Sequence, residues 1–210
     1  MTVVIVDYGS GNLRSAQKAF ERVSGTNGPQ ICVSNEARDV LRATHIVLPG
    51  VGAFADCKRG IDALPGMRDA LHKSVIEREV PFLGICVGMQ LMASIGYENG
   101  LHEGFNWING DVVPIKPKNN LKIPHMGWND ITVSRKHLLL DGLGTGSHVY
   151  FVHSFHMQCL IDSEVIATVD YGETIAAVVH KKNMVGTQFH PEKSQAIGLR
   201  FISNFLGYKY

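Results

Sequence analysis

The chain has 210 residues, 45% of them hydrophobic and 19% charged, and its formal net charge at pH 7 is +1. This composition is typical of a folded globular protein, and the lack of a basic excess excludes tight nonspecific binding of nucleic acid. No apolar run approaches the ~18 residues of a membrane span, and the first residues lack the basic flank of a signal peptide. We therefore expect a cytosolic protein with neither a membrane nor a nucleic-acid partner.

The four cysteines are scattered along the chain at positions 32, 57, 86 and 159, and none forms a Cys-x-x-Cys pair. This spacing argues against both a disulfide framework and a structural zinc site. We expect free thiols, no metal and no cofactor. A functional cysteine then has to be identified from its sequence context.

Short apolar runs alternate with helical patterns along the chain, which predicts an open α/β sheet covered on both faces. The predicted strands cover residues 3–6, 45–48, 80–85, 149–152, 165–169, 175–180 and 184–189. The predicted helices cover residues 13–23, 36–42, 66–78 and 194–206. In such sheets ligands bind beyond the carboxyl ends of the strands, so the residues that follow the strands are the candidates for function.

Residues 111–170 have a different character, with three prolines, several turn signals and short alternating runs. This pattern predicts antiparallel hairpins added to the same sheet-containing domain. No linker, repeat or low-complexity tract is visible, so we expect a single domain over residues 1–210.

Cys86 stands where a predicted buried strand meets a helical pattern, with glycines two positions before and two positions after it. This G-x-nucleophile-x-G elbow needs glycine for a steric reason, because side chains at Gly84 or Gly88 would collide with neighbouring backbone in the tight turn. The positive end of the following helix also favours a thiolate. We predict that Cys86 is a nucleophile, against the alternative of a buried cysteine in a glycine-containing turn.

His190 follows the predicted strand at residues 184–189, and Glu192 follows two residues later. In extended backbone these two side chains point to the same side, so Glu192 can hydrogen-bond one imidazole nitrogen while the other faces Cys86. Pro191 restricts the backbone between them. The pattern predicts a triad of nucleophile, general base and orienting carboxylate, although a lone histidine on a strand is more often structural.

The segment Pro-Gly-Val-Gly at residues 49–52 follows another central strand. Its glycines free the backbone to turn the amides of Val51 and Gly52 toward a ligand, and the amide of Val87 is the other candidate donor of an oxyanion hole. One helical turn beyond the nucleophile, Gln90 can bind the polar head of an amino-acid substrate. Taken alone, each of these features is also compatible with an ordinary turn or a surface side chain.

Together these segments resemble the class I (triad) glutamine amidotransferases, which pair a G-x-C-x-G elbow with a late His-Pro-Glu. Within that family the resemblance is to the glutaminase subunits of imidazole glycerol phosphate synthase. It is carried by blocks that span nearly the whole chain in the family's order, at residues 7–13, 49–54, 84–90, 124–129, 150–155 and 188–194. Two departures are Phe155, where many relatives have tyrosine, and the stretch 106–111, which lacks the more usual proline.

The resemblance implies a flavodoxin-like open, mostly parallel sheet with helices on both faces and added antiparallel hairpins. It also implies a γ-glutamyl thioester on Cys86 that water resolves to glutamate and ammonia. A separate (β/α)8-barrel cyclase subunit, forming a heterodimer with this chain, would use the ammonia to make imidazole glycerol phosphate in histidine biosynthesis. The glutamine contacts carried over from the family are Gly50, Gly52, Gln90, His153, Ser154 and Phe155.

The length of the chain gives a separate reason to expect a partner. A glutaminase of this type needs about 200 residues in one domain, which leaves no room for an acceptor site. Ammonia released to solvent at neutral pH would be protonated and lose its nucleophilic lone pair, so a sealed passage to the partner is needed. We also expect low glutaminase activity in the isolated subunit, because turnover without a partner would waste glutamine.

Several alternatives remain open from the sequence. The same glutaminase chemistry can serve a paralogous synthase that makes a surface-polysaccharide sugar, and the elbow is also found in cysteine peptidases and other hydrolases. A non-catalytic flavodoxin-like binding module requires the triad to be a coincidence. The Gly-x-Gly at residues 9–11 resembles a dinucleotide loop but has Arg14 in place of the third glycine, so we favour a loop at the active-site edge or partner surface.

Overall fold

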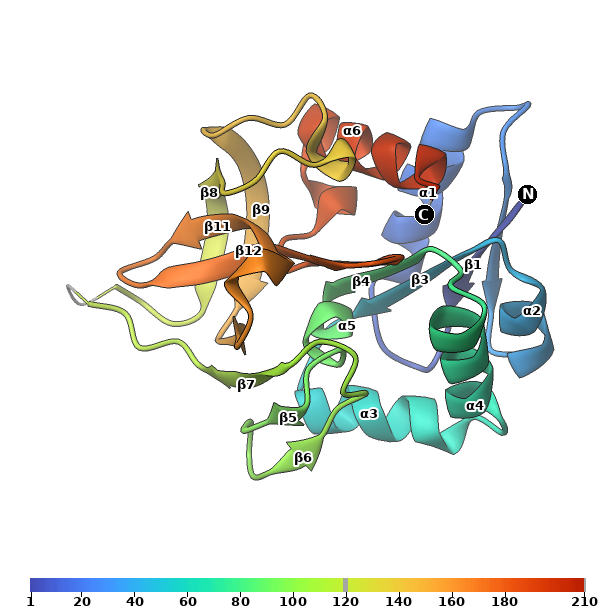
Figure 1. Ribbon diagram of the computed structural model, residues 1–210, viewed down its shortest axis with the longest axis horizontal. Coiled ribbons are helices and arrows are strands. Elements are labelled where there is room, and N and C mark those ends of the chain that lie inside the picture. The colour runs from blue at the N-terminus through green and yellow to red at the C-terminus, as the bar shows by residue number, and fades with distance from the viewer. Residues whose placement is uncertain (119–120, 210) are drawn as a thin grey trace.

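The computed structural model describes residues 1–118 and 121–209, and within these residues a nine-stranded sheet has helices on both faces of its parallel part (Figure 1). Its strand order is β2-β1-β3-β4-β13-β12-β11-β8-β9. The parallel strands are β2 (Gln30–Ser34), β1 (Thr2–Val6), β3 (His45–Gly50), β4 (Phe82–Cys86) and β13 (Met184–Thr187). The antiparallel extension consists of β12 (Thr174–Lys181), β11 (Val165–Asp170), β8 (His125–Val133) and β9 (Ser147–His153). The parallel part has the 2-1-3-4-5 order of flavodoxin-like folds, which confirms the predicted fold class.

The central parallel strands form the core because almost every side chain on them is apolar. All of β3 and β4 is buried, as are the last four residues of β1. Strands covered on both faces need such continuous apolar runs, since neither face meets water. Each strand predicted from these runs corresponds to a strand of the structure.

Helices cover both faces of the parallel part of the sheet. Helices α1 and α6 pack together on one face, and α3 and α4 lie on the other (Figure 1). In α1 the buried residues Ala16, Ala19 and Phe20 recur at helical spacing. The ring of Phe20 packs edge to face against the ring of Phe205 in α6, with 6.3 Å between the ring centroids. The helices are α1 (Leu13–Ser24), α2 (Ala37–Arg42), α3 (Phe54–Ala63), α4 (Met67–His72), α5 (Val87–Gln90) and α6 (Gln195–Gly207).

Helix α3 was not predicted from the sequence, and its N-terminus shows why. The residue that precedes it, Ala53, has no side chain able to cap a helix, and the N–H of Phe54 is satisfied instead by Oε2 of Glu98 at 2.8 Å. Gly60 also weakens the helical pattern, yet it is required, because a Cβ there would lie 2.4 Å from the carbonyl oxygen of Tyr8. Both reasons depend on contacts that are distant in the sequence.

The predicted helix at residues 66–78 is only partly regular. Helix α4 ends at His72, and the chain continues as a π-helical turn at Lys73–Glu77. Strand β2 was also missed, since its burial is only partial and its apolar run is short. Strand β2 lies at the edge of the sheet and the irregular helix covers one of its faces, so neither difference changes the central strands.

The hairpins predicted in residues 111–170 are present, although residues 119 and 120 lie outside the described part. Strands β8 and β9 pair antiparallel along their length, with His125 opposite His153. A smaller sheet packs beside the main one and includes β10 (Phe155–Cys159), β7 (Gly110–Pro114), β5 (Ile95–Gly96) and β6 (His102–Glu103). Short 3-10 turns at Leu138–Leu140, Asp162–Glu164 and Pro191–Lys193 connect these elements.

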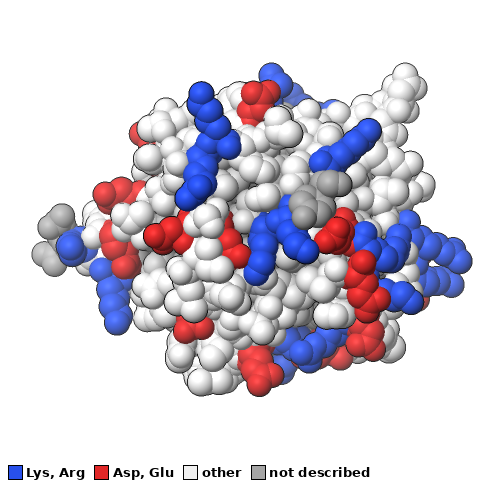
Figure 2. All heavy atoms as spheres, viewed as in Figure 1, with Lys and Arg blue, Asp and Glu red and all other residues white. Residues whose placement is uncertain are grey.

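Charges of both signs are interspersed on one face of the molecule. Figure 2 shows lysine and arginine side chains beside aspartate and glutamate side chains over the face that it draws, with no extended field of one sign. This face therefore offers no extended basic field to a polyanion. Among the described residues, no helix is both long enough and apolar enough to cross a membrane.

Candidate active site

Three neighbouring parallel strands, β3, β4 and β13, end at one edge of the large sheet. Gly50 at the end of β3 lies opposite Cys86 at the end of β4, and Thr187 at the end of β13 lies opposite Ile85. The chain that leaves β13 therefore brings His190 to the edge where Cys86 stands. This is the position at which open α/β sheets bind ligands.

The backbone at Cys86 is strained, as the elbow pattern predicts. Cys86 has φ 54° and ψ −110°, a conformation that side-chain-bearing residues rarely adopt and that costs about 1–3 kcal/mol. A Cβ at Gly84 would lie 2.6 Å from the carbonyl oxygen of Gly88, and a Cβ at Gly88 would lie 1.8 Å from that of Leu48. Only glycine fits at these two positions. Because α5 is a single turn, its dipole at the thiol is weaker than that of a long helix.

His190 and Glu192 form a buried hydrogen-bonded pair. Nδ1 of His190 lies 2.8 Å from Oε1 of Glu192, and each side chain is 2% exposed. The predicted contact is present, but the extended backbone predicted for it is wrong, because Pro191–Lys193 form a 3-10 turn. Ser194 holds this turn by donating to the carbonyl of His190 at 2.7 Å and accepting the N–H of Tyr150 at 3.0 Å. With Nδ1 engaged, Nε2 is the nitrogen left for Cys86.

The imidazole of His190 is in its charged form at neutral pH, with a proton on each ring nitrogen. Burial acts to lower the pKa of His190, but its interactions with Cys86 and Glu192 outweigh burial and raise the pKa to about 10. Nε2 is itself buried and has no hydrogen-bond partner among the described residues. A protonated imidazole beside a cysteine is the arrangement that supports a thiolate nucleophile.

A cavity of about 280 Å³, here named the Cys86 cavity, opens at this edge. Its size is near the lower end of small-ligand sites, which are about 300–1,000 Å³. Gly50 and Glu192 are not part of its lining, since Gly50 lies within the sheet opposite Cys86 and Glu192 lies on the far side of the His190 ring. The other predicted site residues all line it, namely Val51, Gly52, Cys86, Val87, Gln90, His153, Ser154, Phe155 and His190.

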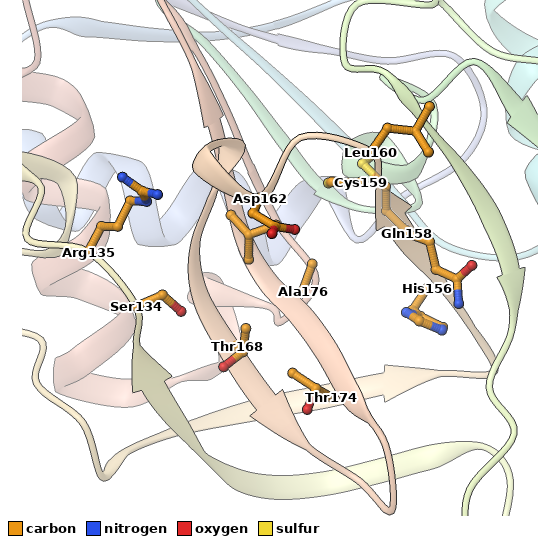
Figure 3. Close-up of a pocket in the computed structure, with 12 residues that line it drawn as sticks. Ser134, Arg135, His156, Gln158, Cys159, Leu160, Asp162, Thr168, Thr174 and Ala176 are labelled. Atoms are coloured by element: carbon orange, nitrogen blue, oxygen red, sulfur yellow. The ribbon is translucent and has the colours of Figure 1, made fainter.

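A larger cavity of about 790 Å³ lies between β10 and strands β11 and β12, and Figure 3 shows Asp162 on one side of it and His156 on the other. The thiol in this cavity belongs to Cys159. Burial, followed by the charges of Glu164 and Asp162, raises the pKa of Cys159 to about 12. A thiol that stays protonated is a poor nucleophile, so the Cys86 cavity is the candidate active site.

The predicted oxyanion segment, residues 49–52, is held by a serine outside it. The N–H of Val51 points to Oγ of Ser10 at 3.4 Å, and the Ser10 hydroxyl donates to the carbonyl oxygen of Val51. In this conformation the Val51 amide faces Ser10 and not Cys86. An oxyanion hole made by Val51, Gly52 and Val87 therefore stays a prediction.

The loop that contains Ser10 is the Gly-x-Gly segment after β1. Tyr8 donates its hydroxyl to the carbonyl of Pro49 at 2.7 Å, and a Cβ at Gly11 would lie 3.1 Å from the same oxygen. The loop thus packs against the oxyanion segment. This agrees with the prediction of a loop at the active-site edge.

Gln90 is buried, and its amide orientation is fixed. Nε2 donates to the carbonyl of Phe155 at 2.9 Å and to Oε1 of Gln188 at 3.1 Å, so both of its N–H groups are used. Oε1 of Gln90 is the atom left to accept a hydrogen bond from a ligand, such as an ammonium group. The amide of Gln188 in turn donates to Sγ of Cys86 at 3.7 Å.

Three residues of the site were not predicted from the sequence. Ser10 contacts Val51, Gln188 contacts both Gln90 and Cys86, and Glu98 lines the cavity while it caps α3. Gln188 lies in the segment 188–194 with His190 and Glu192, but its role depends on a partner 98 positions away. Ser10 lies in the Gly-x-Gly segment at residues 9–11, but that pattern does not show which backbone group the serine binds, and Glu98 stands in no such motif. Among the described residues, no group of three or more His, Cys, Asp and Glu side chains is arranged to hold a metal ion.

Comparison with known proteins places this geometry in a family. The profile described as Glutamine amidotransferase class-I matches residues 4–207. Over the full length of both chains, the protein is 53% identical to an imidazole glycerol phosphate synthase subunit HisH of Cereibacter sphaeroides and 54% identical to one of Rhodopseudomonas palustris. A solved glutamine amidotransferase matches with a TM-score of 0.72 at 19% identity, covering 98% of this chain and 99% of the other. A solved putative GMP synthase protein from Thermoplasma acidophilum matches with a TM-score of 0.70 at 20% identity, covering 99% and 92%. The chain belongs to the class-I glutamine amidotransferase family.

Proposed function

We propose that this chain is a single-domain glutaminase subunit that hydrolyses glutamine to glutamate and ammonia and delivers the ammonia to a separate cyclase protein. The observation that carries the proposal is the Cys86 cavity, which is lined by both Cys86 and His190. The backbone of Cys86 is strained, and His190 is protonated and bound through Nδ1 to the carboxylate of Glu192. The cyclase is proposed because the two relatives named above are subunits of imidazole glycerol phosphate synthase.

The first half of the reaction forms the thioester. The sulfur of Cys86 attacks the side-chain carbonyl carbon of glutamine, and the carbonyl π electrons move to oxygen. When the tetrahedral intermediate collapses, the C–N bond breaks, and His190 gives its Nε2 proton to the departing nitrogen, which leaves as ammonia. Glu192 keeps the proton of the imidazole on Nδ1 and holds the ring in place throughout.

The second half releases glutamate. Neutral His190 takes a proton from water, the hydroxide attacks the thioester carbonyl, and the C–S bond breaks to restore the Cys86 sulfur. Donors from Val87 and the oxyanion segment stabilise both tetrahedral intermediates, each contributing about 3–4 kcal/mol. Oε1 of Gln90 and the carboxylate of Glu98 suit the α-ammonium group of the substrate.

A cyclase partner is supported by exposed apolar side chains on strand β8, which begins next to the Cys86 cavity. Pro124 lines the cavity, and β8, which starts at the following residue, exposes Met126 and Trp128, which are 61% and 45% accessible. Large apolar side chains that are exposed on one strand are typical of a protein-protein interface. A barrel docked on β8 and over Pro124 would cover the cavity and keep ammonia from solvent.

The test is to copurify the chain with its candidate cyclase and measure glutamate release with and without the cyclase substrate. We expect release that depends on Cys86 and that increases when the cyclase is loaded. A Cys86→Ala variant that is folded, binds the cyclase and still releases glutamate would refute the proposal. An active chain that couples only to another synthase would instead support the paralogous function.

A further inference from the structure

A row of hydrogen-bonded side chains runs from strand β8 to the Cys86 cavity. Nδ2 of Asn129 lies 3.2 Å from Nε2 of His125, and Nδ1 of His125 lies 2.9 Å from Nε2 of His153. Nδ1 of His153 lies 2.9 Å from the carbonyl oxygen of Phe155. The same oxygen accepts the amide of Gln90, so the row ends on the residue that we expect to bind the substrate ammonium.

The carbonyl end of this row fixes the proton of His153. A carbonyl oxygen can only accept, so Nδ1 of His153 must carry a hydrogen and donate it to Phe155. Its Nε2 is then a bare acceptor. The hydrogen between the two rings therefore sits on Nδ1 of His125, whose own Nε2 is left as an acceptor.

The amide end of the row requires the same assignment. Oδ1 of Asn129 accepts the N–H of Asp130 at 2.8 Å, while Nδ2 donates to the carbonyl of Asp170 at 3.0 Å. The group that Asn129 presents to His125 is thus a donor, which matches the bare Nε2 of that ring. The reverse polarity would set two N–H groups against each other at this end and two lone pairs against each other at Phe155.

Packing holds the two rings in these orientations. His125 is stacked between Phe151 and Tyr171, with ring centroids 4.7 Å and 4.0 Å away and interplanar angles of 21° and 22°. Both histidines are buried. Burial lowers the pKa of His125 to about 4 and that of His153 to about 3, so both rings are neutral at neutral pH, as the row requires.

We propose that His125 is a positioning residue for glutamine: through His153 it holds the carbonyl of Phe155, which in turn holds the Gln90 amide with its oxygen available to the substrate. The inference rests on the proposed function and deepens it. His125 does not line the cavity, and it acts only through His153. Its loss would weaken glutamine binding more than it slows the chemistry at Cys86.

The most direct test is nitrogen NMR of the full chain labelled with ¹⁵N-histidine at neutral pH, with assignments from single-histidine variants. The structure requires His125 and His153 to carry hydrogen on Nδ1 and not on Nε2. Finding hydrogen on Nε2 of either ring would overturn the inference. This readout needs no activity and no partner.

The kinetic test compares two substitutions in the complex with the cyclase. His125→Phe keeps a flat ring between Phe151 and Tyr171 but has no donor for His153, so we expect the KM for glutamine to rise about 10-fold, or about 1.4 kcal/mol, with kcat within about 3-fold. His125→Asn loses the ring stacking but keeps an N–H near the Nδ1 position, so its KM should stay within about 3-fold of the unmodified chain. Exposed His72→Phe is the control.

A merely structural His125 would give the opposite order. His125→Asn would then be the more impaired variant, and His125→Phe, with its ring retained, would keep the KM of the unmodified chain. Either result would overturn the inference, with thermal melting used to confirm that each variant folds. An unmodified chain that releases no glutamate would end the proposed function instead, and the NMR test would still decide the role of His125.

Discussion

At the scale of single residues, the site depends on how His190 is held. Its Nδ1 is bound to a carboxylate that is itself buried, which leaves Nε2 as the only nitrogen that can exchange protons with the reacting atoms. The pKa of His190, raised to about 10, means that the ring enters the reaction already protonated. Glu192 is thus important for both the charge and the orientation of the ring.

Replacing Glu192 by glutamine tests this role. Glu192→Gln keeps the shape of the side chain but removes the charge, so the imidazole loses both its fixed tautomer and the stabilisation of its protonated form. We expect kcat for glutamate release to fall by roughly 10³-fold, and the thermal midpoint to fall as well, because the buried protonated ring loses its charged partner. Steady-state kinetics in the complex measures the effect, and a kcat within about 3-fold of the unmodified chain would contradict the assigned role.

Ser10 is the second residue whose contact has a consequence for activity. Its hydroxyl holds both the N–H and the carbonyl of Val51, so the amide cannot serve an oxyanion at Cys86 in this conformation. Ser10→Ala removes both hydrogen bonds, and we expect glutamate release by the chain without its partner to rise about 3- to 10-fold. Activity that is unchanged, or that falls in the absence of the partner, would show that Ser10 does not restrain this segment.

Residue identities in the triad were predictable because each stands in a short motif with its own steric or chemical requirement. Cys86 needs its flanking glycines, and Glu192 lies only two positions from His190. Ser10 and Gln188 were not predictable in the same way. Their partners, Val51 and Gln90, are 41 and 98 positions away, and only the fold brings them together.

At the scale of elements, the backbones of β3, β4 and α5 come into close contact at the elbow that contains Cys86. The carbonyl of Leu48 in β3 packs against Gly88 so closely that no side chain fits between them. The sheet order places β3 next to β4, so the strained turn at Cys86 is supported by its neighbouring strand.

Gly88→Ala is expected to disrupt this support. The added Cβ would lie 1.8 Å from the oxygen of Leu48, so the backbone must move, and we expect a loss of about 3 kcal/mol or more in the free energy of unfolding. Gly144→Ala is the matched control, since a Cβ there meets nothing within 4 Å, and it should change stability by less than about 1 kcal/mol. Urea titrations measure both variants, and equal stabilities would contradict the close contact.

Strands and helices were predictable where the pattern of apolar residues was sufficient to identify them. The apolar runs of β1, β3 and β4 predicted central strands, and the helical spacing of Ala16, Ala19 and Phe20 agrees with α1. Helix α3 was not predictable, because its cap comes from Glu98 and its Gly60 is required by the distant Tyr8. Local sequence carries no record of such contacts.

At the scale of the whole molecule, buried histidines make stability depend on pH. The pKa values of His125 and His153 are lowered to about 4 and about 3, so the unfolded chain takes up protons that the native chain does not. Their contribution to stability is complete above about pH 6.5 and is lost as the pH falls from about 6.5 toward 4 and 3. His190 acts in the opposite direction, with a contribution complete below about pH 6.5 and lost as the pH rises through about 10.

We therefore expect the urea midpoint of the unmodified chain to fall steadily between about pH 6.5 and about pH 4. In His125→Phe one titrating ring is absent, so the fall should be shallower although the protein is less stable at neutral pH. His72→Phe, a change at an exposed position, should follow the unmodified chain. Parallel pH slopes for all three proteins would contradict the assignment of buried, neutral rings.

The outer face of β8 gives a prediction about assembly. Met126 and Trp128 are exposed on β8, the strand that follows Pro124 of the Cys86 cavity, whereas Leu160 is equally apolar and 82% exposed at the far end of β10 from Phe155. Met126→Glu should weaken binding to the cyclase at least about 10-fold, because a charge would be buried at the proposed interface on β8. Leu160→Glu should leave the affinity unchanged. Titration calorimetry measures both, and equal losses would place the interface elsewhere.

Glutamine hydrolysis by this chain requires a covalent bond between glutamine and one sulfur. Intact-protein mass spectrometry of the complex, acid-quenched during turnover, should detect a γ-glutamyl adduct, and peptide mapping should locate it on Cys86. In Cys86→Ala the adduct and the release of glutamate should both disappear while the fold is retained. An adduct on another residue, or undiminished glutamate release from Cys86→Ala, would contradict the central claim.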